Sequence, residues 1–565
     1  MSDAAHRDAN VRELARAWSA LDPSDADRRE VQGWLETDNL PELRLSFAGQ
    51  LSFGTAGMRG PLRPGPAGMN LAQVARVTTA VGRHLDADGV DGCVIIGFDG
   101  RRGSRAFALQ AARVLTAMGR RVLRFDEVVP TPLVAWTVLR ERAAAGLVVT
   151  ASHNPPDDNG YKVFWGDGAQ IVPPHDARIA EQLASVTELP SGGHEGEVLS
   201  EEVVEAYVQD VLALRVRPGA APLRIVYTPL HGVGAPFVKE VLSRAGYPDV
   251  HIVAEQEAPD GRFPTVAFPN PEEDGALDLA FALADEVKAD LVIANDPDAD
   301  RLALAVPTAE GWRRLTGNEI GNLLAEELLT HGRYAEPRGV ANTIVSSTRL
   351  AQIAAHHGVR YAATLTGFKW LARVAMALAE EGGTLVLGYE EALGYSVGGL
   401  VRDKDGVSAA LIAADLASAV RAQGRSLVDL LDDMDRRYGA LVGRQRSLVR
   451  QGVEGAEAIR QGMERLRAQP PTTLGGAQVA ATTDLREGTK TSAAGVEAVD
   501  LPRSNVLAYE LVGGHRALVR PSGTEPKLKI YVEASTPPQG DLEAERKEAS
   551  VLAEAIESDL LAQVS

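Results

Sequence analysis

Three aspartates alternate along the short stretch "DPDADR": Asp296, Asp298 and Asp300. Alternation in an extended loop places the three carboxylates on one side, and oxygen atoms are the ligands that Mg²⁺ and Ca²⁺ prefer. An EF-hand calcium loop is excluded, because it needs Gly at its sixth position and Glu at its twelfth, where this chain has Arg301 and Pro307. The pattern predicts a metal site with an arginine beside it for an anion. The alternative is a solvated acidic turn.

A serine and a histidine stand side by side in "TASHNP", directly after the apolar run "GLVVT". Ser152 is not in a G-x-S-x-G elbow, so the sequence does not support an α/β-hydrolase triad. From residue type alone, a turn or a helix cap is the simpler interpretation. Beside metal-binding and phosphate-binding loops, however, Ser152 could carry a phosphoryl group as a covalent intermediate.

Two further loops contain the residue types that bind phosphate. The stretch "RPSGTEPK" combines cations, hydroxyl groups and a glycine, so its backbone N–H groups and its arginine could converge on an anion. An ordinary Pro-Gly turn with a basic flank is the alternative. The stretch "FGTAGMRG" offers a second tight loop, which presents Arg59.

Several of the motif loops follow short apolar runs, and such runs alternate with helical stretches rich in Ala and Leu. Such alternation is typical of α/β domains with largely parallel sheets covered on both faces, and their ligands bind beyond the carboxyl ends of the strands. The runs that we expect to form strands are 93–98, 146–150, 224–228, 290–295, 339–345 and 384–389.

The two ends of the chain differ from this pattern. Residues 1 to about 45 predict amphipathic helix, with a break and a new helix start at Pro23-Ser24. The region after about 450 predicts a half-exposed antiparallel sheet and a long final helix. We therefore expect three similar mixed or parallel-sheet α/β domains and a smaller C-terminal α+β domain. The predicted bounds are 1–217, 218–335, 336–450 and 451–565.

Composition narrows the class of partner. The net charge of −19 argues against nucleic acid and anionic membranes as partners. No run approaches the roughly 20 apolar residues that span a bilayer, and the polar first residues lack a signal-peptide pattern. The single cysteine, Cys93, cannot form an internal disulfide, so we expect a cytoplasmic protein. Within this acidic chain, the motif loops still collect Arg59, Lys162, Arg301, Lys404, Arg520 and Lys527, which suits a small anionic substrate.

The order of the motifs resembles a known family. "TASHNP", "DPDADR", "GYEEALGY", "DKDG" and "RPSGTEPK" follow one another as in the α-D-phosphohexomutase superfamily, which includes phosphoglucomutases and phosphomannomutases. "FGTAGMRG" and "FDGRRGS" fit as well, and the resemblance runs from about residue 50 to 535. The N-terminal extension and "GYEEALGY" are most similar to the branch that contains phosphoglucomutases and phosphopentomutases.

The resemblance implies four domains around a central cleft and a role for each motif. Ser152 matches the serine that carries the phosphoryl group, and it completes the ligands of one Mg²⁺ ion with the three aspartates. The positions that match basic or proton-transferring groups are Arg59, His153, Lys162, Arg301 and Lys404, with His153 and Lys404 as the candidates for proton transfer. The positions that match sugar-binding and phosphate-binding residues are Thr366, Gly367, Glu390, Ala392, Arg520, Ser522, Gly523, Thr524 and Lys527.

The implied reaction is an intramolecular phosphoryl transfer. We expect an isomerase that interconverts α-D-glucose 1-phosphate and glucose 6-phosphate through a phosphoserine and a bound sugar 1,6-bisphosphate, as a monomer or homodimer. One departure affects the sugar: many members have Ser two residues after the sugar-binding Glu, and this chain has Ala392. Mannose phosphate and pentose phosphate are therefore alternative substrates. A metal-dependent sugar phosphatase and a catalytically silent sugar-phosphate sensor are more distant alternatives.

Overall fold

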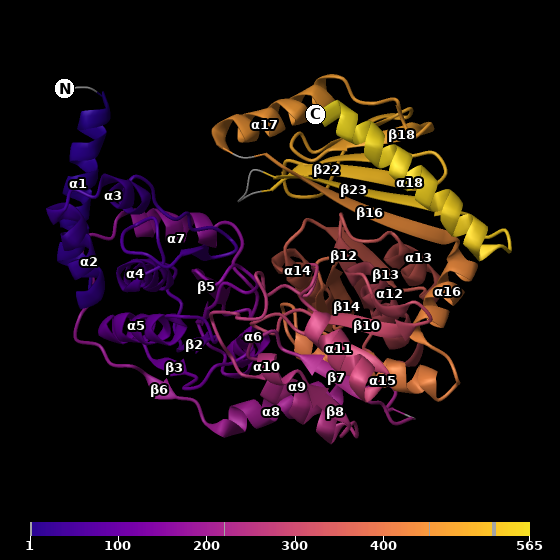
Figure 1. The fold of residues 1–565 in the computed structure, drawn as a ribbon, viewed down its shortest axis with the longest axis horizontal. Helices are drawn as coiled ribbons and strands as arrows, with labels where there is room; N and C mark the ends of the chain where they lie inside the picture. Colours follow the sequence, from indigo (N-terminus) through magenta and orange to yellow (C-terminus); the bar gives the residue numbers. More distant parts are fainter. Residues whose placement is uncertain (1–2, 220, 451, 523–526, 565) are drawn as a thin grey trace.

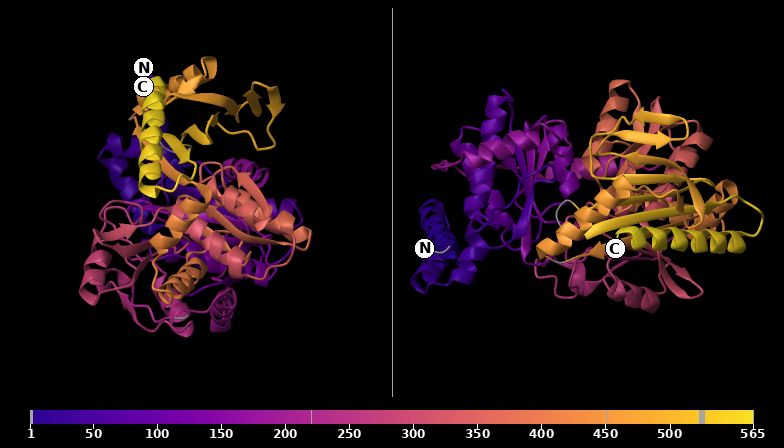
Figure 2. Two further views of the ribbon diagram at one scale, coloured as in Figure 1. Left: turned by 90° about the vertical axis from the view of Figure 1, so that its right-hand side faces the viewer. Right: turned by 90° about the horizontal axis from the view of Figure 1, so that it is seen from above.

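The computed structural model describes residues 3–219, 221–450, 452–522 and 527–564. Three α/β units and a C-terminal sheet unit follow one another along the chain (Figure 1). The C-terminal sheet lies over the third unit, whereas the first unit lies beside the second (Figures 1 and 2). The predicted fold class is confirmed by this arrangement.

Three helices precede the first sheet, α1 (Asp3–Leu21), α2 (Asp25–Glu36) and α3 (Leu40–Phe47). The predicted break at Pro23-Ser24 is confirmed, because Ser24 is the N-cap of α2 and its side chain accepts a hydrogen bond from the Asp27 backbone N–H.

The first α/β unit contains a six-stranded sheet in the order β1-β5-β4-β2-β3-β6. Strands β4, β2, β3 and β6 run parallel, and β5 is antiparallel to β4. Every residue of β2 and β4 is buried, as expected for strands covered by helices on both faces. The elements of this unit are β1 (Met58–Pro61), α4 (Leu71–Ala87), β2 (Val94–Phe98), α5 (Ser104–Ala117), β3 (Val122–Arg124), α6 (Thr131–Arg140), β4 (Ala145–Val149), β5 (Asp158–Trp165), α7 (His175–Ala184), β6 (Glu197–Val198) and α8 (Glu201–Ala213).

The second unit has a five-stranded sheet in the order β11-β10-β9-β7-β8, in which β8, β7 and β9 are parallel. Its central strands are again buried along their whole length. Its elements are β7 (Ile225–Thr228), α9 (Ala235–Arg244), β8 (Val250–Ile252), α10 (Ala254–Glu257), α11 (Asp278–Val287), β9 (Leu291–Ala294), β10 (Ala303–Thr308) and β11 (Gly311–Arg314).

The third unit has a four-stranded sheet in the order β13-β12-β14-β15, with β15 antiparallel at one edge. Its elements are α12 (Gly317–His331), β12 (Arg338–Thr343), α13 (Arg349–His357), β13 (Arg360–Thr364), α14 (Phe368–Glu380), β14 (Thr384–Glu390), β15 (Gly394–Val397), α15 (Gly406–Arg421) and α16 (Leu427–Tyr438).

The C-terminal sheet is antiparallel, as predicted, but it begins earlier in the chain than residue 451. Strand β16 pairs along its whole length with β23. The predicted boundary at 450 rests on the polar stretch that follows it, which is typical of a linker, whereas β16 belongs to the sheet beyond that stretch. The elements are β16 (Ala440–Val449), α17 (Gly452–Ala468), β17 (Thr473–Leu474), β18 (Ala477–Asp484), β19 (Thr489–Ser492), β20 (Gly495–Ala498), β21 (Leu507–Leu511), β22 (His515–Pro521), β23 (Lys527–Thr536) and α18 (Leu542–Val564).

The cores show how the units are joined. One apolar cluster runs through the first three units and includes Ile95, Tyr227 and Leu387. The C-terminal sheet has a core of its own and meets the third unit through a small cluster that contains Leu365 and Tyr531. None of the helices in the described part of the chain combines the length and apolar character that crossing a bilayer requires.

Candidate active site

The loops that follow β4 and β9 meet side by side. Ser152 Oγ donates a 2.8 Å hydrogen bond to Asp296 Oδ2, although 144 residues separate the two in the chain. Both side chains are buried. Each loop follows the carboxyl end of a buried parallel strand, which is where open α/β sheets bind their ligands.

Three loop residues adopt a left-handed backbone conformation that side chains other than Gly rarely take. Ser152 has φ +53°, Ala299 in the aspartate loop has φ +52°, and Leu393 beyond β14 has φ +62°. Such conformations cost on the order of 1–3 kcal/mol each and cluster at functional sites. The three loops therefore have their tips fixed by the surrounding structure.

The three aspartates form a compact buried cluster. One carboxylate oxygen from each of Asp296, Asp298 and Asp300 lies within 4.8 Å of the others. Lys162 Nζ, from β5, lies 2.6 Å from Asp298 Oδ2 and 3.0 Å from Asp300 Oδ2. Thr131 Oγ1 also donates to Asp298 Oδ2, at 2.6 Å. These contacts leave Asp298 Oδ1 and Asp300 Oδ1 buried without a hydrogen-bond partner.

The charges of this cluster suit a divalent cation. Burial raises the pKa of Asp296 well above its ordinary value, and repulsion from Asp300 and Asp298 raises it further. Burial alone would also raise the pKa of Asp298, but Lys162 outweighs it and lowers that pKa. A hard cation would relieve the repulsion and occupy the two unpartnered oxygens, so the residues present fit a metal ion.

His153 lies between the serine and an arginine. Its Nδ1 is 3.1 Å from Ser152 Oγ, and its Nε2 is 3.5 Å from Arg301 Nη2. Burial lowers the pKa of His153 well below its ordinary value, and the positive charges of Arg301 and Arg59 lower it further. The lowered pKa favours the neutral imidazole over the charged one.

Lys404 faces the same cluster from the loop before α15. Its Nζ lies 3.3 Å from Asp300 Oδ2 and 3.3 Å from Asp403 Oδ1. Burial opposes its charge, but Asp300, Asp403 and Glu390 outweigh burial and raise the pKa of the ammonium. Lys404 is therefore a fixed positive charge, whereas His153 is not.

The serine loop is held by an arginine whose role we did not predict. Arg101 is buried and donates to the backbone oxygens of Ser152 at 2.6 Å, Pro155 at 2.8 Å and Asp158 at 3.0 Å, and also to that of Asn154. Arg101 is the first of two adjacent arginines in the motif "FDGRRGS". That pair was the only feature of the sequence that could have pointed to an arginine holding the serine loop.

The predicted sugar-binding positions gather on the third unit. Glu390 Oε1 accepts a 2.6 Å hydrogen bond from the Gly367 backbone N–H, which joins the end of β14 to the loop after β13. Arg520 Nη1, from β22, donates to Thr366 Oγ1 at 3.1 Å, so the C-terminal unit meets these loops directly. Burial raises the pKa of Glu390, and Lys404 partly offsets this effect.

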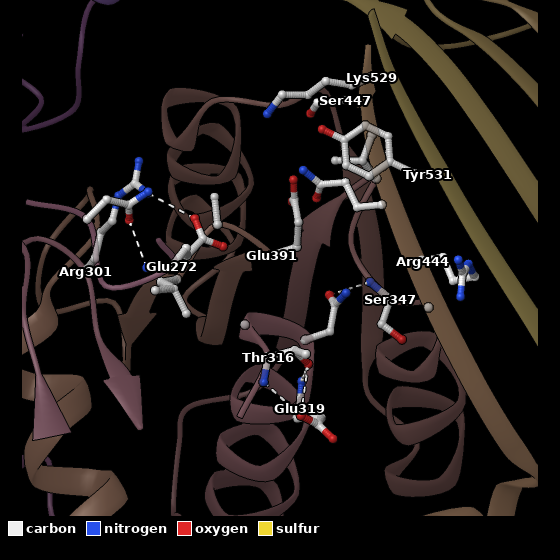
Figure 3. A pocket seen from close by; sticks show the side chains of 18 of the residues that line it. Glu272, Arg301, Thr316, Glu319, Ser347, Glu391, Arg444, Ser447, Lys529 and Tyr531 are labelled. Carbon is white, nitrogen blue, oxygen red and sulfur yellow. Dashed lines mark hydrogen bonds and ion pairs between the residues drawn. The ribbon is translucent and has the colours of Figure 1, made fainter. Parts of the chain in front are cut away.

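A cleft of about 2090 Å³ runs between the units and receives residues from all four. In Figure 3, Arg301 lies on one side with Glu272, and Lys529 and Tyr531 reach in from the C-terminal sheet above Glu391. Predicted site residues that line the cleft are Arg59, His153, Arg301, Ala392 and Lys527.

The predicted residues thus form two groups. The first contains Ser152, His153, Lys162, the three aspartates, Arg301 and Lys404, and the second contains Thr366, Gly367, Glu390 and Arg520. Ser522 and Lys527 close the loop beyond β22, where the Ser522 N–H donates to the Lys527 backbone oxygen at 2.7 Å. Gly523 and Thr524 of that loop lie outside the described residues.

Family models match this chain in four consecutive segments. They describe the α/β/α domains I, II and III and the C-terminal domain of phosphoglucomutase/phosphomannomutase, and they match residues 50–190, 205–311, 316–438 and 477–549. The chain belongs to the phosphoglucomutase/phosphomannomutase family. The expected enzyme class, a mutase that transfers a phosphoryl group within one molecule, is thereby confirmed.

Curated members of this family resemble the chain over most of its length. A probable phosphomannomutase of Haemophilus influenzae is 40% identical, and the match covers 83% of this chain and 93% of the relative. The human phosphopentomutase is 35% identical, and the match covers 97% of this chain and 96% of the relative. A phosphoglucomutase of Staphylococcus epidermidis is 35% identical, and the match covers 90% of this chain and 95% of the relative.

Solved structures of the family share the fold. The crystal structure of a putative phosphomannomutase from Thermus thermophilus has a TM-score of 0.68 at 23% identity, and the match covers 91% of this chain and 99% of that one. At this identity the likeness supports the four-unit architecture of the mutase.

Proposed function

We propose that this mutase interconverts α-D-glucose 1-phosphate and glucose 6-phosphate, with Ser152 as the residue that carries the phosphoryl group. The observation that carries the proposal is the 2.8 Å hydrogen bond from Ser152 Oγ to Asp296 Oδ2, which puts a nucleophile against a cation-binding cluster. The cleft of about 2090 Å³ supports it, because a sugar bisphosphate could turn over inside without leaving.

The proposed cofactor is one Mg²⁺ ion, held by Asp296, Asp298 and Asp300 together with the Ser152 oxygen. When bound, Mg²⁺ would neutralise charge on the phosphoryl group in transfer. The proposal also includes a sugar 1,6-bisphosphate as intermediate and activator, and a cytoplasmic location.

In the first half-reaction, a hydroxyl oxygen of the sugar phosphate bonds to the phosphorus on Ser152. The bond from phosphorus to Ser152 Oγ breaks, the hydroxyl proton moves to a base, and the Oγ that leaves takes up a proton. His153 suits proton exchange with the serine oxygen, because its Nδ1 lies 3.1 Å from Ser152 Oγ and its lowered pKa favours the neutral imidazole. Lys404 keeps its ammonium beside Asp300 and suits charge stabilisation instead.

In the second half-reaction, the bisphosphate has turned end for end. Ser152 Oγ gives up its proton and bonds to the other phosphorus, the bond from that phosphorus to the sugar oxygen breaks, and a proton returns to the sugar oxygen. Arg520 and Lys527 would hold the phosphate that does not react, and Glu390 would accept hydrogen bonds from sugar hydroxyls. Because the C-terminal sheet has its own core, it is the unit that we expect to move to admit substrate.

A pentose 1-phosphate is the second candidate substrate. Ala392 lacks the hydroxyl with which many family members contact the sugar, and the human phosphopentomutase covers 97% of this chain. A mannose 1-phosphate substrate is supported by the name of the Haemophilus influenzae relative.

A side-by-side turnover assay tests the substrate. Glucose 1-phosphate, mannose 1-phosphate and ribose 1-phosphate are compared with Mg²⁺ and the matching sugar bisphosphate, and released phosphate is measured in the same samples. The proposal predicts the highest kcat/KM for glucose 1-phosphate and no net release of phosphate. A preference for ribose 1-phosphate would replace the substrate but keep the mutase, whereas stoichiometric phosphate release would indicate a phosphatase.

A further inference from the structure

A second cluster of metal-binding side chains lies in the first unit. His84 is in the last turn of α4, Asp88 is the C-cap of the same helix, and His175 is the first residue of α7. A histidine and an aspartate four residues apart lie on one face of a helix, and here that face meets the start of α7. None of the three belongs to the site described above.

Three atoms of these residues converge on one point. His84 Nε2 lies 2.9 Å from His175 Nδ1 and 3.6 Å from Asp88 Oδ2, and His175 Nδ1 lies 3.9 Å from Asp88 Oδ2. The position in the plane of the three atoms that is equidistant from them lies about 2.0 Å from each, close to the roughly 2.0–2.2 Å length of Zn–N and Zn–O bonds.

We propose that His84, Asp88 and His175 bind a Zn²⁺ ion that joins α7 to α4. Two imidazole nitrogens and one carboxylate oxygen form a donor set that Zn²⁺ prefers and Mg²⁺ does not. The competing explanation is a hydrogen bond between the two imidazoles, which would account for the 2.9 Å contact but needs no carboxylate.

The surroundings complete the site. The His84 side chain is 2% exposed, whereas those of Asp88 and His175 are each 24% exposed, so a water can reach the ion from the outer side as a fourth ligand. Arg178 Nη1 lies 3.1 Å from Asp88 Oδ1, the oxygen that does not face the histidines, and it would hold the carboxylate in place. The Trp165 ring covers both imidazoles, with its centroid 4.4 Å from that of His175 and 5.1 Å from that of His84.

The position gives the ion a structural role between units. The turn between Trp165 and His175 contacts the third unit, where Arg373 Nη1 donates to Asp167 Oδ2 at 2.6 Å and Gln170 Nε2 donates to Asp403 Oδ2 at 2.7 Å. Through residues 165–175 the first unit contacts the loop that contains Lys404. An ion that holds His175 would therefore fix one end of this segment.

The test is a titration of the complete, tag-free protein with Zn²⁺ in excess Mg²⁺, so that Mg²⁺ occupies the aspartate cluster. Calorimetry measures the stoichiometry, and a thermal scan measures Tm. We expect Zn²⁺ to bind with one equivalent that depends on His175, and Tm to rise. His175→Ala should weaken Zn²⁺ binding by at least about 100-fold, because even partners outside the ligand shell cost 10–100-fold.

Three further variants and one metal substitution keep the result specific. His251→Ala removes an exposed histidine of the second unit and should bind Zn²⁺ as the unaltered protein does. Asp298→Asn alters the aspartate cluster and should keep the Zn²⁺ site. His175→Gln provides a second variant if His175→Ala does not fold. Co²⁺ in place of Zn²⁺ should give intense visible absorption from a four-coordinate site, which both His175 variants lose. No Zn²⁺ binding under excess Mg²⁺, or equal binding in both folded His175 variants, would overturn the proposal.

Discussion

Lys162 Nζ lies 2.6 Å from Asp298 Oδ2, at the centre of the cluster that is proposed to hold Mg²⁺. Both side chains are buried, and burial alone would lower the pKa of Lys162, but Asp298 and Asp300 outweigh it and raise that pKa. The ammonium thus balances part of the negative charge before a metal arrives, and it would face the transferred phosphoryl group afterwards.

Lys162→Met should separate metal binding from catalysis. Two unit charges about 4 Å apart interact by roughly 4 kcal/mol at an effective dielectric constant of 20, so removing the ammonium should tighten Mg²⁺ binding by at least about tenfold. Loss of charge stabilisation should lower kcat by about 10²–10³-fold. Calorimetric Mg²⁺ titration and steady-state kinetics measure the two effects, with exposed Lys239→Met as control. Weaker Mg²⁺ binding in a folded Lys162 variant would contradict this account.

Arg101→Met should release the serine loop. The substitution leaves the backbone oxygens of Ser152, Asn154, Pro155 and Asp158 without their buried donor, which costs on the order of 3 kcal/mol. Because Ser152 would then lose its position, we expect kcat to fall by about 100-fold with little change in KM. Arg105→Met, which removes an exposed ion pair with Asp126, is the matched control and should be silent. An Arg101 variant with normal kcat would show that the loop holds its shape without this side chain.

Ala392→Ser tests the origin of sugar preference. A hydroxyl at this position can donate one hydrogen bond to a hexose, worth about 1–1.5 kcal/mol, so the ratio of kcat/KM for glucose 1-phosphate over ribose 1-phosphate should rise about tenfold. Ala379→Ser, on the exposed face of α14, should leave the ratio unchanged. If the ratio stays constant in Ala392→Ser, the missing hydroxyl does not determine the sugar.

The pH profile tests the role of His153. Burial, with Arg301 and Arg59, lowers the pKa of this imidazole below its ordinary value of about 6.5. His153 therefore stays neutral as the pH falls from 8 to 6.5 and loses its ability to accept a proton only at lower pH. Substrate phosphate also titrates near pH 6, so the quantity to measure is the ratio of kcat/KM between the unaltered enzyme and His153→Gln. This ratio should be constant from pH 8 to 6.5, and a decline centred near pH 6.5 would contradict the lowered pKa.

Local sequence was sufficient to predict the strands that build the site. "GLVVT" and "DLVIAN" are apolar, rich in β-branched residues and followed by polar loops. They form β4 and β9, and Ser152 and Asp296 lie just beyond them. At both places a short apolar run predicts a buried strand, and the polar residues directly after it predict a binding loop. The strand and the site could therefore be inferred together.

Contacts between units could not be predicted in this way. Lys369 donates to Thr55 Oγ1 across 314 residues, and Gln170 reaches Asp403 across 233. No periodicity or spacing encodes such pairs, because they depend on how whole units pack. Strand β16 is a similar case, since its exposed, alternating residues give no signal of the sheet that it joins.

The most direct test of the central claim is the location of the phosphoryl group. The enzyme is incubated with glucose 1,6-bisphosphate and Mg²⁺, digested, and analysed by mass spectrometry, in parallel with Ser152→Ala and with Ser185→Ala as an exposed control. The account predicts phosphate on Ser152, transfer of that phosphate to added sugar phosphate, and no turnover in a folded Ser152→Ala variant. Phosphate on another residue, or near-normal turnover without Ser152, would contradict it.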